Sequence, residues 1–241
     1  MKLEYSPANE PREANTAGVL VVPGGGYGYV TYDKEGVSPA KWLNERGFDA
    51  WILRYTTAQE MAAPIYPVPM QEAQEAVKRI RLEWQPRTLG IWGWSAGGHL
   101  SAITATEGGS APNQRLDFAI LAYPVISMDP GVAHLGSLHN LLGHKPDEEL
   151  RRSMCAETRV TKDTPPVFLF HTANDGNVPV QNSLAFAAAM AKHGRPFHLT
   201  ILPDGPHGVG MALDDPQRTW TGELERWLKT VTCAGAPRSE A

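Results

Sequence analysis

The residues Gly93-Trp94-Ser95-Ala96-Gly97-Gly98 stand where a predicted strand, residues 89–94, ends and a predicted helix, residues 96–106, begins. A serine on such a tight strand-to-helix turn adopts a strained backbone conformation that holds its hydroxyl above the sheet. The flanking glycines fit this turn, because a Cβ there would collide with the neighbouring strand or helix. The placement therefore favours Ser95 as a nucleophile over the alternative, an ordinary glycine-rich turn.

Outside this turn, short β-branched runs alternate with helical patterns along the chain. The predicted strands cover residues 18–22, 49–55, 89–94, 118–123, 167–171 and 197–202, and the predicted helices cover 38–47, 70–80, 96–106, 180–193 and 215–231. This alternation is typical of an α/β fold with a mostly parallel central sheet flanked by helices. No linker rich in Ser, Gly or Pro divides it, so we predict a single domain over residues 1–241. Residues 125–165 are the exception, an irregular stretch expected to form a short insertion over one sheet edge.

The composition excludes several classes of function. Hydrophobic residues make up 42% and charged residues 20% of the 241 residues, as in ordinary globular proteins. A formal net charge of -4 offers no basic excess for nucleic acid, and no run approaches the ~18 apolar residues of a membrane helix. The first residues hold no apolar core of a signal peptide, so the chain as written is expected to be cytoplasmic, or secreted if a leader was removed.

The cysteine and histidine patterns argue against a metal centre. Cys155 and Cys233 are too few for a disulfide scaffold or a cysteine-based zinc site, and two buried free thiols are favoured over a disulfide between them. His134, His139 and His144 recur every five residues, but no helix or strand would hold that spacing on one face. We therefore predict neither a metal nor a cofactor.

A nucleophilic serine needs a base, and the base needs an acid that orients it. In a fold of this kind the expected order along the chain is Ser, Asp, His. Asp175 lies just past the strand at 167–171, among turn-forming residues that would place its carboxylate at the carboxyl end of the sheet. An ordinary Asx turn is the alternative for Asp175. Asp163 precedes its strand, at the wrong end of the sheet, and Asp204 is rather close to the expected histidine to turn back onto it.

His207 is the predicted base. Of the eight histidines it alone follows the last strand, residues 197–202, on a loop punctuated by glycine and proline. His193 ends a helix, where a histidine interacts favourably with the helix dipole. His171 ends a strand and is expected to pack at the edge of the core. His99 lies one helical turn after Ser95, where packing is favoured over a catalytic role.

The oxyanion that forms during acyl transfer needs hydrogen-bond donors. Pro23-Gly24-Gly25-Gly26-Tyr27 follows the first strong strand and offers backbone N–H groups without side chains in the way. A run of three glycines could equally cradle a phosphate, but no Lys-Ser or Lys-Thr follows it, as the phosphate-binding loop requires. The helix N-terminus behind Ser95 adds partial positive charge. We therefore expect an oxyanion hole here.

The order of these motifs resembles the α/β-hydrolases. The matching segments are Gly93-Trp94-Ser95-Ala96-Gly97, Asp175-x-x-Val-Pro and His207-Gly208. The glycine run matches the HGGG region of the hormone-sensitive-lipase-like esterases, except that Pro23 replaces the histidine. Together with Gly-Trp-Ser-Ala-Gly-Gly-His-Leu and the short chain, this is similar to the small acetyl-xylan-esterase-like group, also called BD-FAE-like esterases.

The resemblance implies roles for particular residues. Ser95 would be the nucleophile, Asp175 the acid and His207 the base. The oxyanion donors would be the amides of Ala96 and of Gly25, Gly26 or both. The group's usual substrates, acetyl esters on xylan or xylo-oligosaccharides, are an implication of the same resemblance.

We therefore expect a serine carboxylesterase that works through an acyl-enzyme on short acyl groups, acetyl first, of a small-molecule or oligosaccharide ester. Tyr27, Trp94 and Tyr123, with Tyr29 and Pro124, are expected at the rim of the pocket as contacts for the substrate. A serine peptidase of the prolyl-oligopeptidase type, a formamidase and, from another class, a non-catalytic ligand binder stay open as alternatives. A homodimer is also left open.

Overall fold

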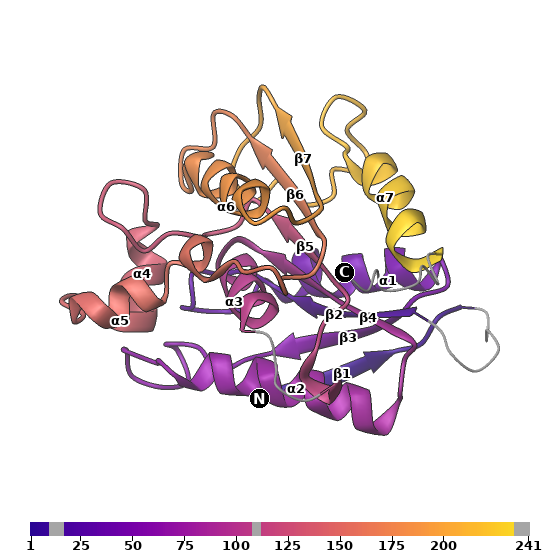
Figure 1. Cartoon of the computed structure of the whole chain (residues 1–241), viewed down its shortest axis with the longest axis horizontal. Helices are drawn as coiled ribbons and strands as arrows, with labels where there is room; N and C mark the ends of the chain where they lie inside the picture. The colour runs from indigo at the N-terminus through magenta and orange to yellow at the C-terminus, as the bar shows by residue number, and fades with distance from the viewer. Residues whose placement is uncertain (10–16, 108–111, 234–241) are drawn as a thin grey trace.

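The computed structural model describes residues 1–9, 17–107 and 112–233, and it contains a seven-stranded sheet of order β1-β3-β2-β4-β5-β6-β7 (Figure 1). The strands are β1 (Lys2–Ser6), β2 (Ala17–Val22), β3 (Asp49–Arg54), β4 (Thr88–Trp94), β5 (Phe118–Ala122), β6 (Val167–Thr172) and β7 (Phe197–Leu202). β1 pairs antiparallel with β3, and all the other pairs are parallel. The mostly parallel sheet that the sequence predicted is confirmed.

Helices cover both faces of the sheet. The first hydrophobic cluster packs α2 (Val68–Glu83), α3 (Ser95–Thr106) and α6 (Gln181–Lys192) on one face, and the second packs α1 (Ser38–Asn44) and α7 (Thr221–Cys233) on the other (Figure 1). Every residue of β5 and β6 is buried, as expected for parallel strands covered on both sides. None of the helices in the described ranges combines the length and hydrophobicity that a bilayer crossing needs.

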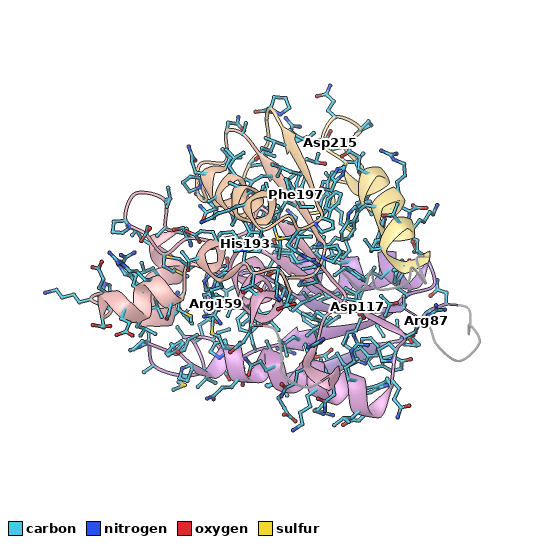
Figure 2. All side chains as sticks on the ribbon, in the orientation of Figure 1. Arg87, Asp117, Arg159, His193, Phe197 and Asp215 are labelled. Atoms are coloured by element: carbon cyan, nitrogen blue, oxygen red, sulfur yellow. The ribbon has the colours of Figure 1, made fainter. Side chains whose placement is uncertain are left out.

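Two elements differ from the sequence prediction. The antiparallel edge strand β1 was not predicted, because none of its five residues is buried; it pairs with β3, and the Tyr5 ring stacks on Trp51 at 5.5 Å. The closing helix was predicted from residue 215 but begins at Thr221. Asp215, labelled in Figure 2, instead forms a turn in which its carboxylate accepts a hydrogen bond from the Gln217 amide at 3.0 Å. Such local side-chain bonds compete with helix formation.

Residues 125–165 are irregular only in part, and the prediction of a wholly irregular stretch is wrong. They form α4 (Leu135–Leu142), α5 (Glu148–Ser153) and a 3-10 turn, η3 (Ala156–Arg159). Each helix begins at a side chain that accepts amide hydrogen bonds: His134 caps α4, and Asp147 caps α5. Helix α4 contributes to the pocket described below rather than covering an edge strand. Cys155 in this segment is a buried free thiol, as predicted, whereas the side chain of Cys233 lies outside the described residues.

His99 on α3 has the packing role that its position predicts. It is fully buried; its Nδ1 accepts a hydrogen bond from the Tyr27 hydroxyl at 2.7 Å, and its Nε2 donates to the Met154 carbonyl at 2.8 Å. Both nitrogens are satisfied in the neutral ring, and burial lowers the pKa of His99 to about 4.

This buried ring should make the stability of the protein depend on pH. Since the unfolded chain binds a proton at His99 near pH 6.5 and the folded chain only near pH 4, the stabilisation is complete above pH 6.5 and is lost as the pH falls. We expect the free energy of unfolding in urea to fall by about 2 kcal/mol more between pH 7.5 and 5 in the wild type than in His99→Gln. An equal fall in both proteins would contradict this.

Candidate active site

Ser95 opens α3 directly after β4, in the conformation that the sequence predicted. Its φ is +51°, in the left-handed region that non-glycine residues rarely occupy. A Cβ at Gly93 would lie 2.3 Å from the Gly97 carbonyl oxygen, and one at Gly97 would lie 2.2 Å from the Val22 carbonyl oxygen. The glycines around Ser95 are therefore required by the close approach of α3 to β2 and β4.

Three loops at the carboxyl ends of the strands bring Ser95, His207 and Asp175 together. Ser95 Oγ lies 2.9 Å from His207 Nε2, and His207 Nδ1 lies 2.7 Å from Asp175 Oδ2. The carboxylate is an acceptor, so Nδ1 carries the proton and Nε2 is free to accept the proton of the serine hydroxyl. The Asp175 side chain is fully buried, and that of His207 is 16% exposed. The arrangement can activate the serine as a nucleophile.

Asp175 is held by more partners than the sequence suggested. Its Oδ1 accepts hydrogen bonds from the amides of Asn177 and Val178, at 2.9 and 3.0 Å, so the Asx turn considered as an alternative is present as well. Burial would raise the pKa of this carboxyl, but hydrogen bonds from His171, His207 and the two amides outweigh it and hold the pKa well below its ordinary value. Asp175 therefore stays ionised beside His207.

His171 is a residue of the site that sequence reasoning missed. It is fully buried, and its Nε2 donates to the Val178 carbonyl at 2.9 Å while lying 3.5 Å from Asp175 Oδ2. The sequence predicted only a packed residue at the end of a strand. The relevant signal is its place four residues before Asp175, with the strand end between them.

The rival acids lie elsewhere. Asp204 is exposed, and its carboxylate accepts hydrogen bonds from Asn174 at 2.7 Å and from Arg218 at 2.5 Å. Asp163 is exposed at the amino end of β6. Neither carboxylate is aimed at His207.

The glycine loop after β2 supplies free amides beside Ser95. Gly25 and Gly26 have φ values of +127° and +62°, and a Cβ at Gly25 would lie 2.1 Å from the Tyr29 carbonyl oxygen. The Gly24 amide donates to Glu35, whereas the amides of Gly25 and Gly26 have no acceptor among the described residues. The Ala96 amide belongs to the first turn of α3, where N–H groups lack an intrahelical acceptor. These are the amides that the family resemblance implies as oxyanion donors.

The prediction that Tyr27, Trp94 and Tyr123 contact the substrate is wrong, because all three are buried and none lines the pocket. The Tyr27 hydroxyl bonds to His99 in the layer under α3. Trp94 is the last residue of β4, and its ring stacks on Trp92 at 4.9 Å in the layer under α7. Side chains at strand ends enter one of the two cores, which proximity to Ser95 in the sequence does not reveal.

The pocket in front of Ser95 has a volume of about 580 Å³ and a lining of mixed polarity, with no Val, Leu, Ile, Met or Phe among its residues. His134 and Asn140, from the segment predicted to be irregular, were missed by sequence reasoning. His134 Nδ1 accepts from the Ser137 amide and hydroxyl, so its proton sits on Nε2, and Asn140 Nδ2 donates to the Gly26 carbonyl at 2.9 Å. The lining residues are Gly25, Gly26, Gly28, Tyr29, Thr31, Lys34, Glu35, Ser95, His134, Gly136, Asn140, Asn177, His207 and Gly208.

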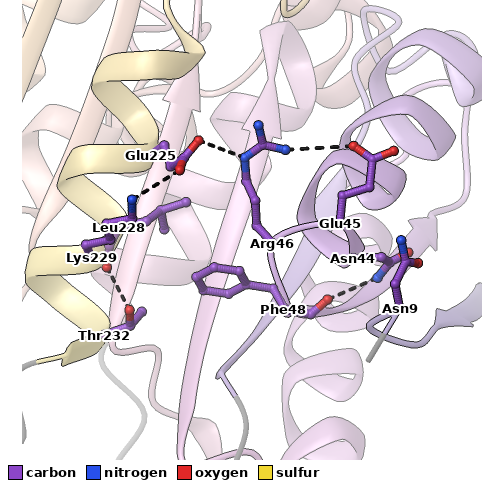
Figure 3. Close-up of a pocket in the computed structure, with 10 residues that line it drawn as sticks. Asn9, Asn44, Glu45, Arg46, Phe48, Glu225, Leu228, Lys229 and Thr232 are labelled. Carbon is purple, nitrogen blue, oxygen red and sulfur yellow. Dashed lines mark hydrogen bonds and ion pairs between the residues drawn. The ribbon is translucent and has the colours of Figure 1, made fainter. Parts of the chain in front are cut away.

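A larger cavity, about 720 Å³, lies between α1 and α7. Figure 3 shows Arg46 in it between two carboxylates, with Glu225 at 3.0 Å and Glu45 at 3.8 Å. Its charged groups pair with one another, and its described lining holds no serine or histidine. We therefore assign the chemistry to the smaller pocket.

One group of described side chains offers metal-ligand atoms close together. Asp129, Cys155 and Glu157 place theirs within 4.8 Å of one another. Asp129, however, is paired with Arg151, and burial raises the pKa of the Cys155 thiol, which disfavours the thiolate that a metal needs. These groups are absent from the lining of the pocket at Ser95.

The chain is similar to proteins of known family and structure. A family model described as the prolyl oligopeptidase family matches residues 70–233. The solved structure of an acetyl ester-xyloside bifunctional hydrolase from Caldicellulosiruptor lactoaceticus superposes with a TM-score of 0.85 and 35% identity, covering 95% of this chain and 88% of that one. The α/β-hydrolase fold predicted from the sequence is confirmed.

Two curated proteins are also similar. Endo-1,4-beta-xylanase B of Butyrivibrio fibrisolvens is 33% identical over 218 residues, which cover 85% of this chain and 34% of that protein. Acetylxylan esterase of Xylanibacter ruminicola is 31% identical over 247 residues, which cover 96% of this chain and 48% of that protein. The chain thus spans between about a third and a half of the length of these relatives.

Proposed function

The chain belongs to the prolyl oligopeptidase family of α/β-hydrolases, and from that premise we propose that it is a serine carboxylesterase that removes acetyl groups from carbohydrates such as xylan or xylo-oligosaccharides. The observation that carries the proposal is the hydrogen-bonded series Ser95, His207 and Asp175, which opens into the pocket of about 580 Å³ beside free glycine amides. The acetyl and xylan parts are supported by the names of the similar proteins.

The proposed mechanism is acyl transfer through Ser95. His207 Nε2 takes the hydroxyl proton as Oγ attacks the ester carbonyl, and the ionised Asp175 stabilises the imidazolium that forms. The amides of Gly25, Gly26 and Ala96 bind the oxyanion. The C–O bond then breaks, His207 returns the proton to the leaving alcohol, and acetyl-Ser95 remains. Water, deprotonated by the same histidine, attacks this ester and releases acetate, and Ser95 regains its proton.

The pocket supports a carbohydrate ester better than a lipid. A sugar brings several hydroxyls that need hydrogen-bond partners, and Thr31, His134, Asn140 and Asn177 offer such partners around Ser95. Tyr29 at the rim is 55% exposed and presents an aromatic face on which a sugar ring can pack. A long acyl chain would need an apolar channel, and the side chains lining this pocket do not form one.

The acyl preference is testable with synthetic esters. We expect p-nitrophenyl acetate to be hydrolysed with a kcat/KM at least about 100-fold above that of the octanoate, because six additional methylenes find no Val, Leu, Ile, Met or Phe side chain to pack against among the lining residues. Acetate release from acetylated xylo-oligosaccharides, measured in the same preparation, tests the carbohydrate part. Preference for octanoate would contradict the short-acyl proposal, and release from aryl acetate alone would contradict the carbohydrate proposal.

A peptidase activity is the alternative that the family match favours. An enzyme that trims amino-terminal residues needs a carboxylate to hold the substrate's amine. Glu35 is the one carboxylate among the lining residues, and both its oxygens already accept hydrogen bonds from the protein. We therefore expect aminoacyl p-nitroanilides to be poor substrates, and their efficient turnover would favour the peptidase.

A further inference from the structure

A buried carboxylate lines the pocket but does not belong to the series of Ser95, His207 and Asp175. Glu35 lies in η1 (Asp33–Val37), a single π-helical turn, and is only 4% exposed. Its Oε2 accepts a hydrogen bond from the Gly24 amide at 2.8 Å, and its Oε1 accepts one from the Tyr123 hydroxyl at 2.9 Å. Burying a carboxylate is unfavourable unless its oxygens are hydrogen-bonded, and π-turns are frequent at functional sites.

The first of these bonds fixes the glycine loop after β2, whose amides are proposed to bind the oxyanion. Gly24 directly precedes Gly25 and Gly26, and it lies against the nucleophile turn so closely that a Cβ on it would come 2.9 Å from Ser95 Cβ. The bond from Gly24 to Glu35 therefore sets the distance between the free amides and the reacting oxygen. It also leaves Gly24 unable to serve as an oxyanion donor itself.

The second bond reaches the loop that carries His207. The Tyr123 hydroxyl, which donates to Glu35, accepts a hydrogen bond from the Gly210 amide at 3.1 Å. The Tyr123 ring also packs edge-on against the His207 ring, with centroids 5.1 Å apart. Lys34, the neighbour of Glu35 in the same turn, donates to the Gly208 carbonyl. The π-turn thus holds the His207 loop at two points.

The hydrogen bonds indicate that Glu35 is ionised. A neutral carboxyl would carry a proton on one oxygen, but Oε2 faces an amide donor. A proton on Oε1 would leave the Tyr123 hydroxyl without an acceptor, since its oxygen already accepts from Gly210. Burial raises the pKa of Glu35 above its ordinary value, and the bonds from Gly24 and Tyr123 and the charge on His207 offset part of this rise.

The charge on Glu35 also acts on the base. The charged or titratable groups around His207 are Asp175, which accepts its Nδ1 proton, Tyr123, whose ring packs against it, and Glu35, Lys34 and His134, which line the same pocket. Negative charge on Glu35 favours the imidazolium that forms during acyl transfer.

We propose that Glu35 is a positioning residue. Through Gly24 it holds the glycine loop, and through Tyr123 it holds the His207 loop, each at the distance from Ser95 that acyl transfer requires. The inference rests on the proposed acyl-transfer function. One buried carboxylate thus connects the loop that binds the oxyanion to the loop that carries the base, and both loops must act on the same carbonyl group.

The test compares Glu35→Gln with Glu72→Gln, a matched control. Glu72 also accepts one backbone amide and one hydroxyl, both from Thr56 at 2.7 Å, but it does not line the pocket. For Glu35→Gln we expect kcat on p-nitrophenyl acetate to fall about 10- to 100-fold with KM within about threefold, because misplaced groups act on the transition state more than on binding. We expect the acid limb of kcat/KM to move to lower pH, since a negative charge near His207 is lost. Glu72→Gln should change neither.

Two further measurements test the role of Glu35 without relying on ester hydrolysis by Glu35→Gln. Tyr123→Phe keeps the bond from Glu35 to Gly24 but breaks the connection to Gly210, so it should lower kcat even if Glu35→Gln does not fold. The rate of Ser95 labelling by a fluorophosphonate should fall in parallel, and it needs no ester substrate. A wild type that is labelled but does not hydrolyse acetyl esters would overturn the proposed function and leave this test intact. Labelling rates and acid limbs unchanged in folded Glu35→Gln, or full activity in Tyr123→Phe, would overturn the role of Glu35.

Discussion

Replacing Ser95 by alanine should lower kcat by on the order of 10⁶-fold while leaving the fold intact. The substitution removes the oxygen that lies 2.9 Å from His207 Nε2, and with it the acyl-enzyme. The backbone at this position has φ +51°, which alanine adopts at about the same strain as serine, so little stability should be lost. Turnover of p-nitrophenyl acetate and the melting temperature measure the two effects.

The matched control for this variant is Ser101→Ala. Ser101 is a buried serine on the same helix, and its hydroxyl has no hydrogen-bond partner among the described residues, so its removal should leave kcat within about twofold. Fluorophosphonate labelling should be lost in Ser95→Ala and retained in Ser101→Ala. Normal hydrolysis by Ser95→Ala would refute the assignment of the nucleophile. An unlabelled, inactive wild type would favour a ligand-binding protein.

Replacing Asp175 by asparagine should lower kcat by on the order of 10⁴-fold with KM nearly unchanged. The amide has the same shape, but its NH₂ group competes as a donor for His207 Nδ1 and favours the tautomer that carries the proton on Nε2. That tautomer cannot accept the proton of Ser95. The measurement is steady-state kinetics on p-nitrophenyl acetate.

Asp204→Asn is the control for this second variant. Asp204 is the other carboxylate near His207 in the sequence, and its side chain is exposed and bonded to Asn174 and Arg218. We expect its kcat to stay within about twofold of the wild type. If Asp204→Asn were the impaired variant and Asp175→Asn were not, the assignment of the acid would have to be exchanged.

The features that were predictable from the sequence are those with a local backbone requirement. Gly93 and Gly97 are demanded by the turn at Ser95, and the glycines at 25 and 26 by their positive φ values. Continuous apolar runs predicted the buried strands, and the strand ends located the loops of Asp175 and His207. The error over residues 125–165 has a local cause as well. Its helices are only 8 and 6 residues long, too short for a clear period among so many glycines and prolines.

Where a side chain points at the end of a strand, and which distant groups it meets, was not predictable in this way. Tyr27, Trp94 and Tyr123 looked like pocket residues because they flank motif residues, yet each is buried in a core. Glu35 gave no sequence signal, because its partners Gly24 and Tyr123 come from other elements of the chain.

The six parallel strands, the nucleophile turn and the glycine loop follow from the sequence, because each depends on the conformation of a few consecutive residues. The approach of His171 to within 3.5 Å of Asp175, and the connection that Glu35 makes between Gly24 and Tyr123, arise only in the folded structure. The reason is that a buried charge is stabilised by all the donors around it, and these come together only when the sheet and its helices have packed.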